Sequence, residues 1–299
     1  MMKQTPVMRS KSVFSMMPMD APDMSRLSEL RNEHKDEVLS FLAVRPVHTI
    51  VMTSFIIDNG MESELNRGKF YGYRNAEGKL EGVAVIGHAT LVEARSENAL
   101  KALAFAAKSS ETPIHLIMSG DTDAESFWNY YSDGIREPRL TCTEQLFEIG
   151  FPYPVQDCEF EIRMAKPEEL IRIAEAQAEV AFMECGVDPM LKDREGFLNR
   201  VARRIEQDRI FVVYEQGDLV FKADIISETD EAIYLEGIYV APEYRGRGVG
   251  SRCLSKLGLH LLNRVQNICL LSNVEFESAH QSFRKAGFKG TDRCTTIFV

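Results

Sequence analysis

A glycine-rich junction between residues 238 and 253 constrains the fold of this chain more than any other feature. The run reads IYVAPEYRGRGVGSRC, in which Gly246, Gly248 and Gly250 alternate with arginine and valine. A β-branched run precedes the glycines, and the run that follows them has apolar residues at helical spacing. The junction therefore predicts a strand that enters a helix through a loop with almost no side chains.

Such a loop favours the binding of an anion. The first turn of a helix has unbonded N–H groups whose dipoles point outward, and glycines let the backbone approach oxygens that a Cβ would repel. Arg245 and Arg247 add positive charge. Ser251 stands where a dinucleotide fingerprint has its third glycine, and no Walker loop occurs. We therefore expect a diphosphate here, with a flexible Arg-Gly turn of no chemical role as the alternative.

The sequence patterns around this loop predict an α+β domain over residues 158–299. Pro167 begins a helix pattern with acidic residues in its first turn, and Gly217-Asp218 marks a hairpin. In order, the predicted elements are β α α β β β α β α β. They lie at 158–165, 166–182, 191–208, 210–227 (two strands), 231–240, 254–265, 267–273, 276–288 and 294–299.

The first half repeats this order less clearly, and the seam between the halves lies at GFPYPVQD, residues 150–157. Two prolines after a glycine make an extended connector, so residues 151–157 are predicted to be a linker. Residues 21–150 are interpreted as a diverged duplicate of the second domain, with an unrelated α+β domain as the alternative. Ser96 is a candidate helix cap, and RSEN (95–98) stands where the glycine loop would fall. Residues 1–20 are expected to form a mobile tail.

Composition narrows the class of partner. The formal net charge of −10 argues against nucleic acid and suits an amine-bearing substrate, although a charge that merely confers solubility explains it equally well. Six cysteines without a C-x-x-C pair favour a reduced, cytoplasmic protein, and no cysteine–histidine spacing indicates a metal site. No apolar run suggests a signal peptide or a membrane span.

The second half resembles the GNAT superfamily of N-acyltransferases. In YVAPEYRGRGVG, Arg245, Gly248 and Gly250 stand on the defining positions of the acetyl-CoA signature R/Q-x-x-G-x-G/A. The later run from Asn273 to Phe288 also resembles that family. The resemblance covers residues 158–299 and implies a mixed, splayed sheet with acetyl-CoA in the gap between the strands that end at Val240 and Asn273. The whole chain then looks like a tandem GNAT protein, with two GNAT-like α+β domains of mostly antiparallel twisted sheet flanked by helices, of which 21–150 is the degenerate one.

The resemblance also implies a set of site residues. The coenzyme contacts are expected at Ile238, Tyr239, Val240, Arg245, Gly246, Arg247, Gly248, Val249, Gly250, Ser251, Asn273, Phe283 and Lys285. Main-chain N–H groups at 238–240 are expected to hold the thioester carbonyl, and Gly237 is a candidate β-bulge.

Catalytic candidates lie on the same strand. Strand alternation predicts Tyr234, Glu236, Ile238 and Val240 on one face, with Glu236 as a base or amine anchor. A surface or ion-paired glutamate is the alternative. Phe283 replaces the tyrosine that the superfamily commonly uses as acid, so Ser282, His280, a water molecule or the other domain remain candidates, or no acid is needed. His280 is more simply a helix-surface residue.

The acceptor pocket is expected beside the segment FMECGVDPMLKD, residues 182–193, where Glu184, Asp188 and Asp193 can hold a cation or form a solvated acidic loop. FWNYY, residues 127–131, is expected to pack in a core. The predicted function is transfer of an acetyl group from acetyl-CoA to a primary amine of a small molecule or peptide in a ternary complex, by a monomer or homodimer without metal. The alternative is a non-catalytic acyl-CoA sensor or regulatory module.

Overall fold

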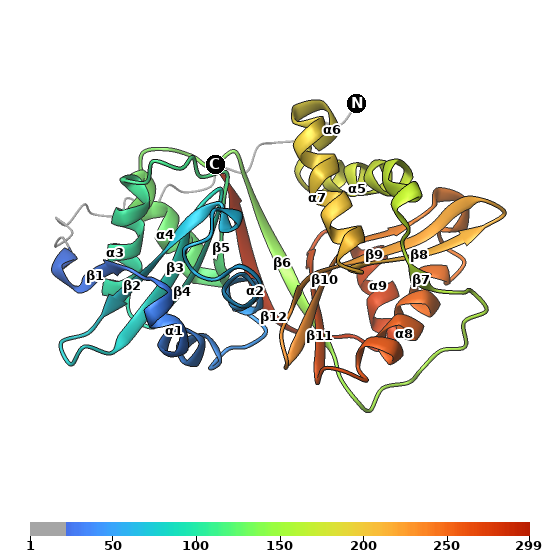
Figure 1. Ribbon diagram of the computed structural model, residues 1–299, viewed down its shortest axis with the longest axis horizontal. Helices are drawn as coiled ribbons and strands as arrows, with labels where there is room; N and C mark the ends of the chain where they lie inside the picture. The colour runs from blue at the N-terminus through green and yellow to red at the C-terminus, as the bar shows by residue number, and fades with distance from the viewer. Residues whose placement is uncertain (1–21) are drawn as a thin grey trace, which may run out of the picture.

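One continuous mixed β-sheet runs through the computed structural model, which describes residues 22–299. Its strand order is β1-β2-β3-β4-β5-β12-β6-β11-β10-β9-β8-β7, and helices cover both faces (Figure 1). This arrangement confirms the predicted α+β class. The predicted tail over residues 1–20 lies outside the described residues.

Each half follows the predicted order of elements. The amino-terminal half contains β1 (Leu27–Glu29), α1 (Lys35–Leu42), α2 (Ile50–Asn59), β2 (Gly68–Arg74), β3 (Leu80–Gly87), β4 (Ala89–Ala94), α3 (Glu97–Lys108), β5 (Leu116–Gly120), α4 (Asp121–Ser132) and β6 (Leu140–Ile149). The carboxyl-terminal half contains β7 (Arg163–Met164), α5 (Leu170–Cys185), α6 (Pro189–Lys192), α7 (Arg194–Glu206), β8 (Ile210–Glu215), β9 (Asp218–Glu228), β10 (Ala232–Val240), α8 (Val249–Leu261), β11 (Asn267–Asn273), α9 (Glu277–Ala286) and β12 (Lys289–Phe298). None of the described helices combines the length and apolar character that a membrane crossing requires.

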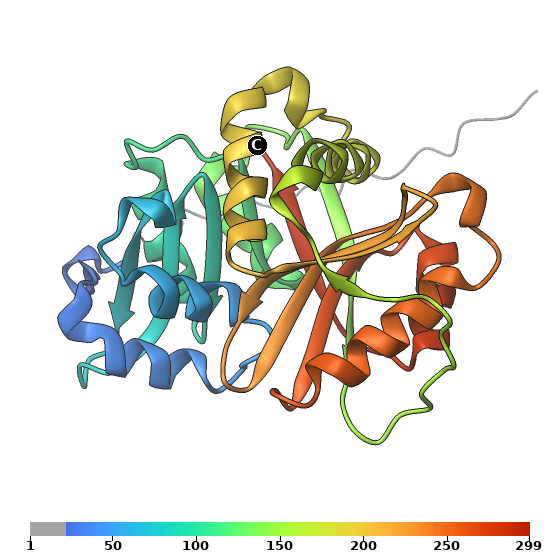
Figure 2. The same ribbon diagram turned by 45° about the vertical axis from the view of Figure 1, so that its right-hand side comes forward.

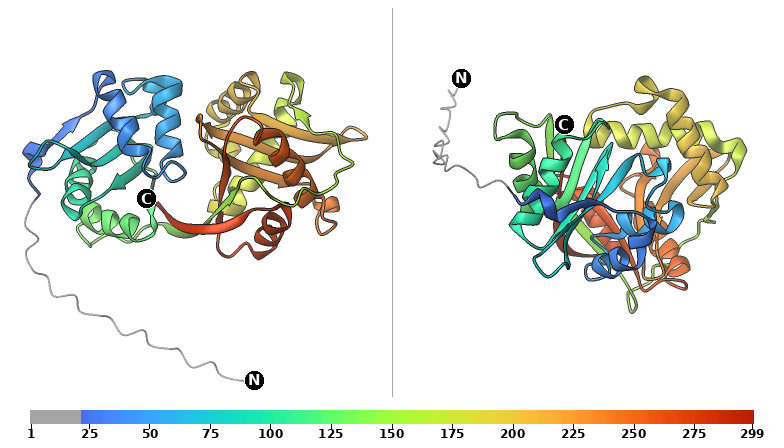
Figure 3. Two further views of the ribbon diagram at one scale, coloured as in Figure 1. Left: turned by 90° about the horizontal axis from the view of Figure 1, so that it is seen from below. Right: turned by 60° about the vertical axis from the view of Figure 1, so that its left-hand side comes forward.

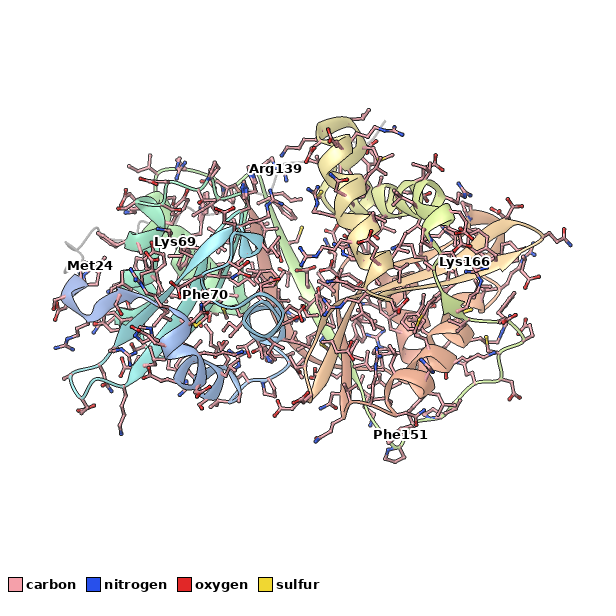
Figure 4. The ribbon with its side chains drawn as sticks, viewed as in Figure 1. Met24, Lys69, Phe70, Arg139, Phe151 and Lys166 are labelled. Atoms are coloured by element: carbon pink, nitrogen blue, oxygen red, sulfur yellow. The ribbon has the colours of Figure 1, made fainter. Side chains whose placement is uncertain are left out.

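The two halves exchange their last strands. β6 lies between β11 and β12, and β12 lies between β6 and β5 (Figure 3, left). β6 crosses the molecule from Arg139, just before it, to Phe151, just after it (Figure 4). Phe147 of β6 packs in the core of the carboxyl-terminal half, and Ile297 of β12 packs in that of the amino-terminal half. Each half therefore completes its sheet with a strand from the other.

The helices form two layers. α1, α2, α5 and α7 pack on one face of the sheet, and α3, α4, α8 and α9 pack on the other (Figure 2). The aromatic run 127–131 packs in the core as predicted, with Phe127 fully buried. α2 reaches across the boundary between the halves, because its Ile50 packs with Tyr234 of β10 and its Asp58 forms an ion pair with Arg209 at 2.8 Å.

The sheet parts between β10 and β11. The two strands pair in parallel from Ala232 with Asn267 to Leu235 with Leu270, and the pairing stops there. β10 nevertheless stays paired with β9 as far as Val240. Gly237 and Ile238 together oppose the single residue Ala223 of β9, and Gly237 has φ +58°. This bulge, predicted at Gly237, turns β10 away from β11 and produces the expected gap.

In the amino-terminal half, β4 and β5 also separate along their length, but no glycine loop follows β4. β4 and β5 pair in parallel only as far as Leu91 with Met118. The connection from β4 to α3 consists of residues 95 and 96, and the hydroxyl of Ser96 accepts the Ala99 N–H at 3.3 Å, as predicted for a helix cap. Glu93 comes four residues after the first paired residue of β4, as Glu236 does on β10, but it is buried and paired with Arg45 at 3.2 Å.

Two local predictions differ from the structure. The strand predicted at 158–165 is reduced to Arg163–Met164, and residues 150–162 contain neither helix nor strand. Its alternating pattern is satisfied without pairing, because Cys158, Phe160 and Ile162 pack on the core below α8. The segment between α5 and α7 contains the additional short helix α6.

Candidate active site

The glycine loop, residues 246–248, is open where a ligand would approach. Gly246 and Gly248 both have φ +74°, a backbone conformation that favours glycine, and a Cβ built on Gly246 would meet no atom within 4 Å. Gly248 is the N-cap of α8, and no side chain caps this helix start. Gly250 faces Val240, whose Cγ2 would lie 3.1 Å from an added Cβ. The loop therefore offers uncapped amides beside the end of β10.

The arginines of the loop have different surroundings. Arg245 donates from Nε to the Val240 carbonyl at 2.8 Å, and its Nη2 pairs with Glu179 of α5 at 2.8 Å. It therefore ties the loop to α5 and to the end of β10. Arg247 is exposed at the rim of the loop.

The other predicted coenzyme contacts line the gap only in part. Ile238 and Val240 are half-buried against the core beneath α8 and α9, whereas Tyr239 points to the opposite face and packs against α5 and α7. Phe283 is buried against Phe147. The remaining predicted contacts are buried Val249, buried Ser251 (whose hydroxyl donates to the Gly248 carbonyl at 3.0 Å), Asn273 (whose Oδ1 accepts the Glu275 N–H at 2.9 Å) and exposed Lys285.

The prediction that Tyr234, Glu236, Ile238 and Val240 share a face is wrong. Tyr234 and Glu236 lie on the face covered by α2 and α5, while Ile238 and Val240 join the opposite core. The physical reason is the bulge at Gly237, which inserts one residue and reverses the alternation beyond it. Glu236 thus faces one side of the parted sheet, and the peptide at Ile238 borders the other.

Tyr234 and Glu236 are in direct contact. The Tyr234 hydroxyl donates to Glu236 Oε1 at 2.8 Å. Burial raises the pKa of Tyr234 far above its ordinary value, and the charges of Glu236 and Glu144 raise it further. The phenol therefore remains a proton donor to the carboxylate throughout the physiological range.

Two more carboxyl groups surround this pair, from different parts of the chain. Glu144 lies on β6, where the hydroxyl of Thr296 from β12 donates to its Oε2 at 2.5 Å. Burial, and then the charge of Glu236, raise the pKa of Glu144 to about 7. Glu184, at the end of α5, has an exposed side chain, and its carboxyl group lies near enough to Glu236 and Glu144 for their charges to act on it. Desolvation and the charges of Glu236 and Glu144 raise its pKa to about 8.

Sequence reasoning missed Glu144 because only the strand exchange brings β6 beside β11 and β12. It also missed Lys222 of β9, which is fully buried and lies beneath the bulge. Lys222 forms an ion pair at 2.6 Å with Asp224, which is also fully buried. A buried charged pair within a strand pattern has no local sequence signal other than two charges where apolar residues are expected.

The remaining candidates lie elsewhere. Ser282 is half-buried on α9, which packs on the face opposite Tyr234 and Glu236. His280 is 6% exposed and packs against Phe147, so the prediction that it is a surface residue is wrong. The inner face of α9 accommodates it because the ring stacks edge-on against Phe147, and burial lowers the pKa of His280.

Two of the three acidic residues proposed around the acceptor act as helix caps. Asp188 accepts the Met190 N–H at 2.8 Å, and Asp193 accepts the Gly196 N–H at 3.0 Å. Only Glu184 reaches the other carboxyl groups. The six cysteines all lie in the described part of the chain, and no disulfide joins any of them. Among residues 22–299, no group of three or more histidine, cysteine, aspartate or glutamate side chains could hold a metal ion.

Comparison with known proteins agrees with this architecture. Residues 206–290 match the family model for the acetyltransferase (GNAT) domain. No curated protein matches the sequence. Among solved structures, a Drosophila protein has a TM-score of 0.68 at 13% identity, covering 92% of this chain and 98% of its own.

Two further solved structures have names that specify the family. A tandem GNAT protein from the clavulanic acid biosynthesis pathway has a TM-score of 0.57 at 10% identity, covering 91% of this chain and 97% of that one. A GCN5-related N-acetyltransferase from Sphaerobacter thermophilus has a TM-score of 0.57 at 12% identity, covering 91% and 94%. Within the carboxyl-terminal half, residues 206–290 are thus similar to a GNAT acetyltransferase domain. The chain as a whole has the fold of tandem GNAT proteins.

Proposed function

We propose that this protein transfers an acetyl group from acetyl-CoA to a primary amine by direct attack in a ternary complex. The observation that carries the proposal is the parting of β10 from β11 next to the uncapped, glycine-lined start of α8. A diphosphate at the helix start and a pantetheine arm in the gap would place a thioester beside the bulge. In this proposal residues 158–299 bind the coenzyme, residues 151–157 link the domains, and residues 21–150 form the degenerate domain.

The residues present fit the coenzyme. The amides of Gly248, Val249 and Gly250 would hold the diphosphate, with Arg247 at the rim, because no side chain caps this helix start and the space beside Gly246 is open. Ile238 and Val240 would line the pantetheine arm. When bound, acetyl-CoA supplies the activated acyl group.

The chain's own groups would then handle charge and protons. Glu236 takes a proton from the ammonium of the acceptor, and the neutral amine attacks the thioester carbon as the N–C bond forms and the C–S bond breaks. Main-chain N–H groups at 238–240 stabilise the oxyanion. Tyr234 orients Glu236 by its hydrogen bond of 2.8 Å. The departing thiolate would take up, through water, the second proton that the nitrogen loses as the amide forms, because the Phe283 ring has no proton to give.

The acceptor side favours a cation. Glu144, Glu184 and Glu236 converge there, and burial together with their mutual repulsion raises the pKa of Glu144 to about 7 and that of Glu184 to about 8, so both are partly protonated near neutral pH. A bound ammonium would relieve that repulsion. Because Glu144 and Thr296 lie on the exchanged strands, both halves of the fold contribute to the acceptor side.

A second candidate function is a non-catalytic acyl-CoA-binding module. The observation that favours it is the burial of Phe283 against Phe147 at the position of the superfamily's usual acid. Such a module would bind acetyl-CoA and release no thiol.

The test measures thiol release from acetyl-CoA with spermidine, a lysine-containing peptide and an arylethylamine as acceptors. The proposal expects release with at least one amine and a loss of about 10²-fold in kcat for Glu236→Gln. Glu243→Gln, an exposed substitution on the loop before the glycines, serves as the matched control and should retain activity. Saturable acetyl-CoA binding with no thiol release from any amine would contradict catalysis and support the binding module.

A further inference from the structure

Lys222 is a fully buried lysine in a strand, and polar groups surround its ammonium. The Nζ atom donates to Gln177 Oε1 of α5 at 2.5 Å and to the Gly237 carbonyl of β10 at 3.0 Å, and it forms an ion pair with Asp224 Oδ1 of β9 at 2.6 Å. Arg204 of α7 approaches the other oxygen of Asp224 at 3.3 Å. The ammonium is therefore enclosed by three elements, with Glu236 as a further charge nearby.

The contact with Gly237 determines the orientation of one peptide plane. A trans peptide is planar, so its carbonyl and the N–H of the next residue point in opposite directions. Because Lys222 holds the Gly237 carbonyl on the face of α5, the Ile238 N–H points away from that face, toward the side of the α8–α9 core. A Cβ at Gly237 would lie 2.2 Å from Gln177 Oε1 and 2.8 Å from Lys222 Nζ, so it would push both side chains out of their present contacts.

Stability alone does not account for this arrangement. Removing two charges from water is costly, and well-packed apolar residues of similar volume are often as stable as a buried ion pair. The neighbours of Lys222 on β9, such as Phe221 and Ala223, are fully buried and apolar. What an apolar side chain at 222 cannot do is donate to the Gly237 carbonyl.

We propose that Lys222, itself held by Asp224 and Gln177, is a positioning residue that keeps the Ile238 amide directed at the thioester carbonyl of acetyl-CoA. This inference rests on the proposed function. Lys222 does not touch the reacting atoms, and it acts through the Gly237–Ile238 peptide.

The test compares two ligands that differ only at the thioester. Calorimetry on the full chain measures Kd for acetyl-CoA and for CoA, which lacks the carbonyl. For Lys222→Met we expect acetyl-CoA to bind about tenfold more weakly, the size of one lost hydrogen bond, while CoA changes by less than about twofold. With ¹⁵N-isoleucine labelling, the Ile238 amide signal of the wild type should shift more with acetyl-CoA than with CoA, and that difference should vanish in the variant.

Two control variants distinguish a loss of amide positioning from a general loss of stability. Arg209→Met breaks the ion pair with Asp58 and lowers stability without touching the bulge, so both ligands should bind as in the wild type. Gln177→Met removes one acceptor but keeps the Lys222–Asp224 pair, and it carries the test if Lys222→Met does not fold. Its expected effect is smaller but again confined to acetyl-CoA.

The outcomes are distinct. Equal weakening of CoA and acetyl-CoA in Lys222→Met and Gln177→Met, or no weakening of either, would overturn the positioning role while leaving the proposed function intact. A wild-type protein that binds neither ligand would overturn the proposed function itself.

Discussion

Glu144→Gln should stabilise the protein at alkaline pH and leave it unchanged at acid pH. Glu144 is half-buried, and its pKa is raised from the ordinary 4.5 to about 7 by burial and by the charge of Glu236. Because the folded state holds this proton more tightly than the unfolded state, the contribution of Glu144 to stability is greatest below its ordinary pKa. That contribution falls as the pH rises from the ordinary pKa to the raised one, and it is lost above about pH 7.

The size of the stability change follows from the difference between the ordinary and the raised pKa of Glu144. At about 1.4 kcal/mol per pH unit, the ionised Glu144 lowers the free energy of unfolding by at most about 3 kcal/mol. Glutamine has no proton to lose and keeps an oxygen for the Thr296 hydroxyl. Relative to wild type, the variant should thus gain up to about 3 kcal/mol at about pH 8.5 and less than about 1 kcal/mol at about pH 5.

Denaturant titrations at the two pH values measure this difference. The matched control is Glu148→Gln, on the same strand, where the carboxylate accepts the Thr291 hydroxyl at 2.5 Å in an exposed setting. Its effect should be equally small at both pH values. A Glu144→Gln variant whose stability differs from wild type by the same amount at both pH values would refute the reasoning from burial.

Three further predictions concern charge, chain exchange and the bulge. The KM of a cationic amine should fall several-fold as the pH rises from about 6.5 to about 8.5, because Glu144 and Glu184 lose protons and then attract the cation. In Glu184→Gln, the KM should depend less on pH. Deleting residues 289–299 removes β12, which pairs with β5 and β6, so both halves should lose their cooperative denaturation transition. If either half kept a cooperative transition at an unchanged midpoint, the exchange of strands between the halves would be contradicted. Gly237→Ala should lower the free energy of unfolding by about 1–3 kcal/mol in a denaturant titration, because φ is +58° and the new methyl group meets Gln177, and an unchanged midpoint would contradict this geometry.

Local patterns predicted much of this fold. The order of elements, the cap at Ser96 and the bulge at Gly237 depend on a few neighbouring residues, so the sequence reveals them. The gap between β10 and β11 was expected because the glycine loop resembles the acetyl-CoA signature of the GNAT superfamily. The prediction that Tyr234 and Ile238 share a face was wrong, because strand alternation assumes uninterrupted pairing with the neighbouring strand, and the predicted bulge interrupts that pairing.

Long-range pairing determines what could not be predicted. Glu144 and Thr296 meet because β6 and β12 exchange places, and no local pattern encodes that pairing. Lys222 lies in an alternating run that predicts a strand, but its burial depends on the packing of α5 and α7 over β9. His280 has no sequence signal that distinguishes the inner face of α9 from the outer one.

The central claim is that the backbone around Gly248 holds the diphosphate of a coenzyme, and calorimetric titration with CoA tests it most directly. Gly248→Val is compared with Gly78→Val, a hairpin turn with a similar positive φ of +80° and open space around it, so that both variants carry the same kind of backbone strain. We expect one CoA per chain for the wild type and for Gly78→Val, and at least about a tenfold loss of affinity for Gly248→Val. Equal affinity in the two variants, or no binding by the wild type, would contradict it.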